Sequence, residues 1–372
     1  MCGDMTKAAT SIERAWTQFP ENRYCQDELI ERLPGWLPRN KLGLGQQVFR
    51  RAKVASRHMV VGPDEALVAG RSFASKNAVY QRAIRTETSR ICDKILADVP
   101  RSELADVDLL ITASCTGFQI PAMDSLIIQA LGLPLNLRRL NLTEHGCAAG
   151  AAALGMAHEW LTSRKDKRAL VVASEFCSLT FQPEDTSDEN IISAAIFGDG
   201  SAAVLLAGSE APRGNGTVPR FRIRDTFREF FPKTEHFMGF EVNDLGFKIK
   251  LSREVVEFSK GQLPEVFARA CHQWEVSSAQ VFETGSLHPG GRRILEILED
   301  EVGVSSSVTR TSWECLERYG NMSSVSVLAA LERLLATEGE LRPGALGLVT
   351  AFGPGFGAEL SLLDLAPLPM AA

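Results

Sequence analysis

The chain has 372 residues. A single hydrophobic core rarely stabilises a chain of that length, so we expect two domains or two fused halves. Its composition, 45% hydrophobic and 23% charged, is that of a folded globular protein and excludes the disordered, collagen-like and disulfide-scaffold classes. The net charge of -6 offers no general attraction for nucleic acid, which is therefore not expected as a partner.

The first twenty residues lack the apolar core of a signal peptide, and no run of 18 apolar residues occurs anywhere. We therefore expect a cytoplasmic protein without a membrane span. Eight cysteines are scattered without a CxxC pair or zinc-finger spacing, so most are expected to be reduced and buried, with no metal site. What remains open is whether one of them is a nucleophile.

The first hundred residues are rich in charge, and at 26–33 and 72–99 apolar residues recur at helical spacing among Arg, Lys and Glu, so we expect helical surface elements there. Short apolar runs that suit strands buried on both faces follow at 107–113, 168–174 and 202–207. Helical candidates lie between these runs at 125–131 and 148–162. This alternation predicts a layered α/β fold.

A segment rich in glycine, proline and polar residues at 208–219 is the best linker candidate, so we divide the chain into halves 1–212 and 213–372. Strand-like segments in the second half lie at 221–225, 280–284, 345–351 and 358–365, and helical ones at 255–275 and 325–335. LLITASCTG (109–117) parallels VFETGSLHPGG (281–291), and FGDGSAAVLLAG (197–208) parallels FGPGFGAELSLLD (352–364). These echoes predict a weak internal duplication.

Cys147 follows Glu-His-Gly and precedes a helix of very small residues, so it falls at a helix N-terminus. The unpaired N–H groups and the helix dipole favour a thiolate there, and Gly146 lets the backbone turn sharply. A buried structural cysteine is the other interpretation, and the residues alone leave both open.

Two further residues stand in loops that suit catalysis. His288 lies in a Pro-Gly-Gly loop at the end of a predicted strand, where a rigid scaffold presents side chains to ligands. Asn321 lies in a glycine turn before a predicted helix, as an oxyanion donor or simply as a helix cap.

Together, Cys147 in GCAAG, His288 in LHPGG and Asn321 in YGNMSS resemble the Cys-His-Asn triad of the thiolase superfamily. FGDGSAA (197–203) and FGPGFG (352–357) narrow the resemblance to type III polyketide synthases, from about residue 20 to residue 363. SCTGF (114–118) and SEFCSLTFQP (174–183) are similar to bacterial members rather than to plant chalcone synthases. The resemblance implies a thiolase-like αβαβα layered fold of two duplicated half-domains, the first carrying the cysteine and the second the histidine and asparagine.

The resemblance also implies a mechanism. Cys147 would attack an acyl-CoA starter and hold the growing chain as a thioester, while His288 would sustain its thiolate as an ion pair. His288 and Asn321 would bind carbonyl oxygens and stabilise the enolate left by decarboxylation of malonyl-CoA. CoA thioesters are substrates, and no cofactor is implied. We expect a fatty acyl starter and a pyrone, resorcinol or related phenol as product, with a tetrahydroxynaphthalene made from malonyl-CoA alone as the alternative.

Other positions match the family's substrate cavity. Phe197 and Phe247 match its two gatekeeping phenylalanines, with ordinary core packing as the alternative. The remaining matches are Cys115, Cys177, Thr180, Ser323 and Met238. Cys115 stands where plant members usually have threonine, in a hydrogen-bonded chain with Glu175 and Ser323, and a thiol is a poor partner in such a chain.

Two surfaces follow from the same resemblance. Ile120 matches a residue that reaches across a homodimer interface, so a homodimer is expected. Basic residues for the CoA phosphates are sought in the cluster of Arg50, Arg51, Lys53 and Arg57, where a solvated helix face is the alternative.

Two other functions stay open. One is a 3-oxoacyl-carrier-protein synthase III, which shares the triad and makes a single condensation. The other is a non-catalytic scaffold with the thiolase fold. The glycine pattern at Gly353-Pro-Gly355 favours the polyketide synthase over the first. The presence of Cys147, His288 and Asn321 favours it over the second, since a chain that had lost its function would be expected to lose them.

Overall fold

The computed structural model describes residues 9–212, 221–337 and 341–366, and a large mixed sheet runs through it. In spatial order its strands are β11 (Thr284–Leu287), β12 (Leu346–Gly353), β13 (Gly357–Leu365), β8 (Phe221–Phe230), β1 (Thr10–Gln18), β7 (Asp199–Ala207), β6 (Arg168–Phe176), β4 (Val107–Ala113) and β5 (Arg138–Leu142). Two residue pairs join β1 to β8 in the described chain, Thr10 with Ile223 and Ser11 with Arg222. The sheet thus consists of two halves that meet at a narrow junction.

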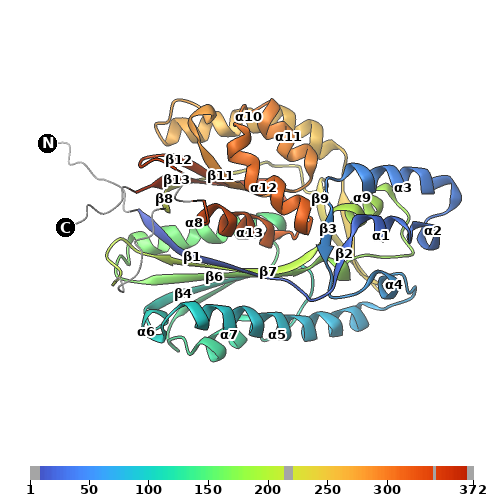
Figure 1. Ribbon diagram of the computed structural model, residues 1–372, viewed down its shortest axis with the longest axis horizontal. Coiled ribbons are helices and arrows are strands. Elements are labelled where there is room, and N and C mark those ends of the chain that lie inside the picture. Colours follow the sequence, from blue (N-terminus) through green and yellow to red (C-terminus); the bar gives the residue numbers. More distant parts are fainter. Residues whose placement is uncertain (1–8, 213–220, 338–340, 367–372) are drawn as a thin grey trace.

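Two helices lie between the halves of the sheet, α8 (Ala149–Thr162) and α13 (Ser324–Leu335) (Figure 1). Helix α8 contacts β4 and β6 on one side and β12 and β13 on the other. Helices α5 (Phe73–Asp98) and α7 (Asp124–Leu131) cover the outer face of one half, while α10 (Glu254–Gln273) and α11 (Arg292–Asp300) cover the other (Figure 1). These five layers confirm the predicted thiolase-like αβαβα fold.

Shorter elements complete the molecule around these layers. The other helices are α1 (Gln26–Ile30), α2 (Leu33–Trp36), α3 (Arg39–Arg51), α4 (Pro63–Ala66), α6 (Arg101–Leu104), α9 (Asp188–Ile196) and α12 (Ser306–Tyr319), with single turns η1 (Gly146–Ala148), η2 (Cys177–Leu179) and η3 (Ala279–Val281). Two small ladders pair β2 (Arg23–Cys25) with β3 (Ser56–His58) and β9 (Met238–Asn243) with β10 (Gly246–Leu251). The second ladder, which the sequence did not predict, forms part of the cavity described below.

The small residues of α8 are explained by its place between two sheets and against α13. A side chain at Gly150 would put its Cβ 2.2 Å from the Ser324 carbonyl oxygen and 2.7 Å from Val327. Ala151, Ala152 and Ala153 are buried in the same contact. Small side chains therefore let the two central helices approach closely and carry the residues at their N-termini to one place.

Several predicted elements match the structure closely. The strand predicted at 107–113 is β4, and the helix predicted at 72–99 is α5 with one residue fewer at each end. The Ser72 side chain caps α5 by accepting a hydrogen bond from the Ser75 N–H, which explains the start of the helix. Strands β6, β7, β8, β12 and β13 overlap their predicted ranges.

The prediction of surface elements in the first hundred residues was wrong for β1, which lies inside the sheet between β8 and β7. Its sequence is too polar to stand out as a buried strand. Thr17 shows why this is tolerated, because its N–H and hydroxyl both donate to the Glu332 carboxylate, at 3.0 and 2.7 Å. The predicted strand at 280–284 was also misplaced, since residues 279–281 form a turn and β11 begins at Thr284.

Corresponding strands stand at corresponding places in the two halves. Strand β4 runs parallel to β6, which runs antiparallel to β7; β11 runs parallel to β12, which runs antiparallel to β13. Most of the predicted linker, residues 213–219, lies outside the described residues, so the boundary at 212 stays a prediction. Within the described chain, no helix is both long and apolar enough to cross a membrane.

Candidate active site

Cys147 lies in turn η1, one turn before α8, close to the predicted helix start. Gly146 adopts a positive φ of 52°, and a Cβ there would lie 2.8 Å from the ring of Pro354, in the loop between β12 and β13. Glycine is required at this position because it alone takes that φ without strain and leaves room for the proline. The fold thus fixes the cysteine backbone between its own helix and the FGPGFG loop.

His288 follows directly after β11 and has 3% of its surface exposed. Its N–H donates to the Thr350 carbonyl at 2.7 Å, and its own carbonyl accepts from the Gly290 N–H at 2.9 Å, so both sides of its backbone are held. Within the described structure its Nδ1 has no hydrogen-bond partner. Burial lowers the pKa of His288 to about 4, so the imidazole is neutral at neutral pH.

Asn321 joins α12 to α13 beside the histidine loop. Its Nδ2 donates to the Gly290 carbonyl at 3.1 Å, and its Oδ1 accepts from the Ser323 N–H at 2.8 Å. An amide nitrogen carries two hydrogens, and Gly290 takes one of them in the described structure. The orientation is therefore fixed with the amide as a donor, as an oxyanion-binding group requires.

These three side chains line one cavity with a volume of about 950 Å³. Seven of the other predicted substrate residues line it as well: Cys115, Cys177, Thr180, Phe197, Met238, Phe247 and Ser323. They come from both halves of the chain, and the β9–β10 ladder closes one wall. The structure thus brings together residues that lie up to 208 positions apart, as at the contact of Cys115 with Ser323.

The surroundings of Cys147, the predicted nucleophile, favour its thiol form in the described structure. Burial raises the pKa of Cys147 to about 11, although the Ser323 hydroxyl favours the thiolate. Because burial also makes His288 neutral, neither charge is stable alone. A thiolate–imidazolium pair would form only if each charge stabilises the other, so the predicted ion pair stays a prediction.

Beneath the nucleophile a hydrogen-bonded network surrounds the buried carboxylate of Glu175. The carboxylate accepts from the Cys115 N–H at 3.0 Å and from its thiol at 3.5 Å, from the Thr116 hydroxyl at 3.0 Å and from the Ser324 hydroxyl at 2.6 Å. Sulfur of Cys115 also lies 3.7 Å from the Ser323 hydroxyl. The chain from Glu175 through Cys115 to Ser323 is therefore continuous, with a thiol as its middle member.

The two predicted gatekeepers occupy different walls. Phe197 ends α9, and its N–H donates to the Ser193 carbonyl at 2.9 Å. Phe247 lies on β10, where its ring packs edge-on against Phe73 at 5.3 Å between centroids and tilted against Phe240 at 5.5 Å. Both side chains line the cavity, so neither serves only to fill the hydrophobic core.

Among the predicted residues for CoA, Arg51 lines the cavity, whereas Arg50 and Lys53 are not among its lining residues. The expectation that Arg57 binds CoA was wrong, because this residue is almost completely buried and its guanidinium donates hydrogen bonds to main-chain carbonyls. Four basic residues that the sequence did not single out line the cavity, namely Lys250, Arg253, Arg292 and Arg293. The Arg-Arg pair directly after HPGG was a signal that could have found two of them.

Ile120 is 82% exposed and does not line the cavity of the single chain. This placement is consistent with the prediction that it contacts a second copy of the chain. Among the described residues, no three His, Cys, Asp or Glu side chains gather in a way that could hold a metal ion. The expected absence of a cofactor stays a prediction.

Two family models match the chain, the N-terminal domain of chalcone and stilbene synthases over residues 58–211 and their C-terminal domain over residues 222–366. A 1,3,6,8-tetrahydroxynaphthalene synthase of Streptomyces coelicolor is 34% identical over 325 residues, which cover 87% of this chain and 83% of that protein. A phloroglucinol synthase of Pseudomonas fluorescens is 31% identical over 345 residues, which cover 92% and 96%. A crystal structure of the Streptomyces coelicolor enzyme superposes with a TM-score of 0.84 at 32% identity, covering 96% of this chain and 99% of that one.

The two family models follow each other in order and together span most of the chain. The relatives match over nearly their whole length, and the similar solved structure has the same fold. These matches confirm the resemblance drawn from the motifs. The chain belongs to the chalcone and stilbene synthase family and is a type III polyketide synthase, an acyltransferase with a thiolase-like fold.

Proposed function

We propose that the protein condenses malonyl-CoA units onto an acyl-CoA starter held on Cys147 and cyclises the product to a pyrone, resorcinol or related phenol. The observation that carries this proposal is the single cavity of about 950 Å³ lined by Cys147, His288 and Asn321 together. A cavity of that size holds a chain of several extension units, whereas a site for one short condensation needs less room.

In the first step the Cys147 sulfur attacks the starter thioester as His288 accepts the thiol proton. Neutral His288 suits this role because its unprotonated form is the one that burial favours. The bond from the acyl carbon to the CoA sulfur breaks, CoA leaves as a thiolate that solvent protonates, and His288 keeps its proton as a donor for the next step. In the second step malonyl-CoA loses carbon dioxide, and N–H donors on His288 and Asn321 stabilise the enolate oxygen. The enolate carbon then attacks the Cys147 thioester, a carbon–carbon bond forms, and the thiolate leaves.

The walls of the cavity support this chemistry. Phe197 and Phe247 exclude water from the enolate, which would otherwise be protonated before it condenses. We assign the CoA phosphates to the basic lining residues, with Arg51 from one half of the chain and Arg292 and Arg293 from the other. A CoA thioester would then enter between the two halves.

We propose a fatty acyl starter because hydrophobic side chains such as Ile196, Met238 and Phe240 line much of the cavity. A second, apolar pocket of about 90 Å³ shares Cys177 and Phe197 with it and offers room for the end of an acyl chain. The second candidate starter is malonyl-CoA itself, giving a tetrahydroxynaphthalene. Two observations favour it, namely Cys115 in the cavity and the similarity to a tetrahydroxynaphthalene synthase.

One experiment separates the starters. The purified protein is incubated with malonyl-CoA alone and with malonyl-CoA plus a panel of acyl-CoA starters, and the masses of the products are measured by mass spectrometry. Product masses that increase with starter length support the fatty acyl starter, while a pentaketide from malonyl-CoA alone supports the naphthalene product. Single-condensation products throughout would refute the polyketide synthase and favour a 3-oxoacyl synthase.

Replacement of the nucleophile tests the chemistry. Cys147→Ala removes the sulfur to which we propose the chain is tethered, so we expect no detectable polyketide from a folded variant. Cys315→Ala, at a buried cysteine outside the cavity, is the matched control and should retain synthesis. Retained synthesis by Cys147→Ala would remove Cys147 from its role.

Cys115 tests the mode of cyclisation. A hydroxyl in place of the thiol would make a stronger hydrogen-bonded chain between Glu175 and Ser323, so Cys115→Ser should shift the ratio of cyclised products. Cys115→Ala removes the link and is the control. Equal product ratios in both variants and the unchanged protein would show that this chain takes no part in ring closure.

We also propose a homodimer. Ile120 and Phe118 are exposed large hydrophobic residues on one loop, with 82% and 54% of their surfaces accessible in the single chain. Burial of that loop by a second copy would remove them from water. Sedimentation equilibrium of the unchanged protein and of an Ile120→Asp variant tests this, with weaker association expected for the variant.

A further inference from the structure

Arg57, in β3, is a buried cation outside the cavity of the triad, with 1% of its surface exposed. Its guanidinium donates to the main-chain carbonyls of Ala194 at 2.9 Å, Ala195 at 2.6 Å and Phe197 at 2.7 Å, and also to the Gln26 side chain. The carbonyls at a helix end lack intrahelical partners and carry the negative end of the dipole. Arg57 therefore satisfies the end of α9 at the point where the chain delivers Phe197.

The same stretch of backbone holds Asn321. The Asn321 N–H donates to the Ile196 carbonyl at 2.7 Å, and the Gly198 N–H donates to the Asn321 carbonyl at 2.9 Å. A Cβ on Gly198 would lie 2.2 Å from the Tyr319 carbonyl oxygen and 3.1 Å from the Arg57 Cβ, so these three segments of the chain are in close contact. The backbone of Phe197 is thus held by Arg57 on one side and Asn321 on the other.

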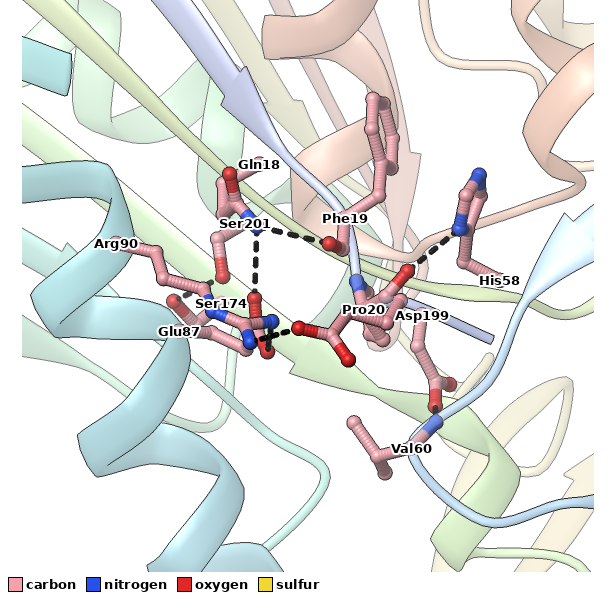
Figure 2. Close-up of polar contacts among 11 residues, drawn as sticks. Gln18, Phe19, Pro20, His58, Val60, Glu87, Arg90, Ser174, Asp199 and Ser201 are labelled. Atoms are coloured by element: carbon pink, nitrogen blue, oxygen red, sulfur yellow. Dashed lines mark hydrogen bonds and ion pairs between the residues drawn. The ribbon is translucent and has the colours of Figure 1, made fainter. Parts of the chain in front are cut away.

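Asp199, two residues after Phe197, fixes a second part of the cavity lining, the turn that carries Cys177. Its carboxylate accepts from the Val60 N–H at 2.7 Å, as Figure 2 shows, and from the N–H and hydroxyl of Ser178 at 2.8 and 2.6 Å. Ser178 lies in turn η2 next to Cys177, which lines the cavity. Asp199 therefore fixes the turn that presents the cavity wall opposite the end of α9.

The two buried charges support each other. Burial lowers the pKa of Arg57 to about 9, and the attraction of Asp199 opposes that shift. Burial raises the pKa of Asp199 to about 6, and its hydrogen bonds and the attraction of Arg57 oppose that shift. Both groups are charged at neutral pH. A buried pair of this kind contributes little net stability, so its value lies in the geometry that it imposes.

We propose that Arg57 and Asp199 are positioning residues that hold Phe197, Asn321 and the turn at Cys177 in register, and so couple malonyl decarboxylation to condensation. This inference rests on the proposed function. Neither residue lines the main cavity, so both act on the triad through the residues that do. Arg57 also borders the smaller pocket that we assign to the end of the acyl chain, so the test uses a short starter that does not reach that pocket.

The coupling can be stated as a choice between two fates of one electron pair. Loss of carbon dioxide from malonyl-CoA leaves an enolate. In the coupled path its carbon attacks the acyl thioester on Cys147, a carbon–carbon bond forms and the carbon–sulfur bond breaks. In the uncoupled path the enolate takes a proton from water and leaves as acetyl-CoA. Misplacement of the Phe197 wall or of the Asn321 donor by about 1 Å favours the second path.

The test measures the ratio of acetyl-CoA to condensed product formed from malonyl-CoA and a starter, together with kcat and KM. Alkylation of Cys147 counts the folded active sites, and kcat is expressed per titrated site. Arg57→Met and Asp199→Asn are the test variants, and Arg57→Lys keeps the charge. Arg168→Met is the matched control, because Arg168 is also 1% exposed but contacts Glu13 and Asp106, which do not line the cavity.

We expect the ratio to rise about tenfold in Arg57→Met, to rise less in Arg57→Lys and Asp199→Asn, and to stay unchanged in Arg168→Met. A purely structural role would lower the number of titrated sites and leave the ratio unchanged, and that result would overturn the proposal. If Arg57→Met does not fold, an unchanged ratio in both Arg57→Lys and Asp199→Asn overturns it equally. Failure of the proposed function would look different, since the unchanged protein would then form either no condensed product or single-condensation products only.

Discussion

His288 offers a quantitative test of the buried site, because its proton uptake differs between the folded and unfolded states. The ordinary pKa of 6.5 applies to the unfolded chain, and burial lowers it to about 4 in the folded one. The unfolded state therefore binds more protons between these values, so this residue's contribution to stability is present above pH 6.5 and is lost as the pH falls toward 4. Between about pH 7.5 and about pH 5 the loss amounts to about 2 kcal/mol.

The assay compares urea unfolding, followed by tryptophan fluorescence at fixed protein concentration, for the unchanged protein and His288→Gln. Other titrating groups, including Asp199 with its raised pKa, shift stability in both proteins and cancel in the comparison. The advantage of the unchanged protein over the variant should therefore shrink by about 2 kcal/mol on acidification to about pH 5. His272→Gln, at an exposed histidine on α10, is the control and should show no such change.

Parallel stability profiles for the unchanged protein and His288→Gln would refute the argument. They would mean that His288 takes up its proton as readily in the folded protein as in the unfolded chain. A preformed thiolate–imidazolium pair would go further, because it would raise the pKa of His288 above its ordinary value and reverse the sign of the difference.

Two further predictions concern the nucleophile. Gly146→Ala should lower turnover at least tenfold and destabilise the fold by about 1–2 kcal/mol, because φ is +52° and the new Cβ would meet Pro354. Gly43→Ala is the control, since a Cβ there meets nothing within 4 Å, and it should leave turnover intact. Alkylation of Cys147 by iodoacetamide should speed up toward pH 11, in line with its raised pKa, and at neutral pH should be about tenfold slower in His288→Gln. Equal alkylation rates in the two proteins would show that His288 does not accept the thiol proton.

Local patterns predicted much of the fold. The apolar runs that became β4, β6 and β7 are buried on both faces, so their own residues identify them. Strand β1 gave no such signal, because its polar residues find distant partners, as Thr17 does with Glu332, 315 positions away. The β9–β10 ladder escaped for a related reason, since much of it is only half-buried and its strands lack a clear alternation.

The triad could be identified from the sequence because each member stands in a glycine-rich turn whose backbone needs are local. Gly146, Gly291 and Gly320 all have positive φ beside Cys147, His288 and Asn321. Sequence alone therefore determined which three residues are the candidates for the chemistry and what family they indicate. Only the tertiary structure decided that Arg57 is buried against the end of α9 instead of facing CoA, and that Arg292 and Arg293 line the cavity. The reason is physical: burial and charge environment depend on which distant segments pack together, and a residue's neighbours in sequence do not specify that.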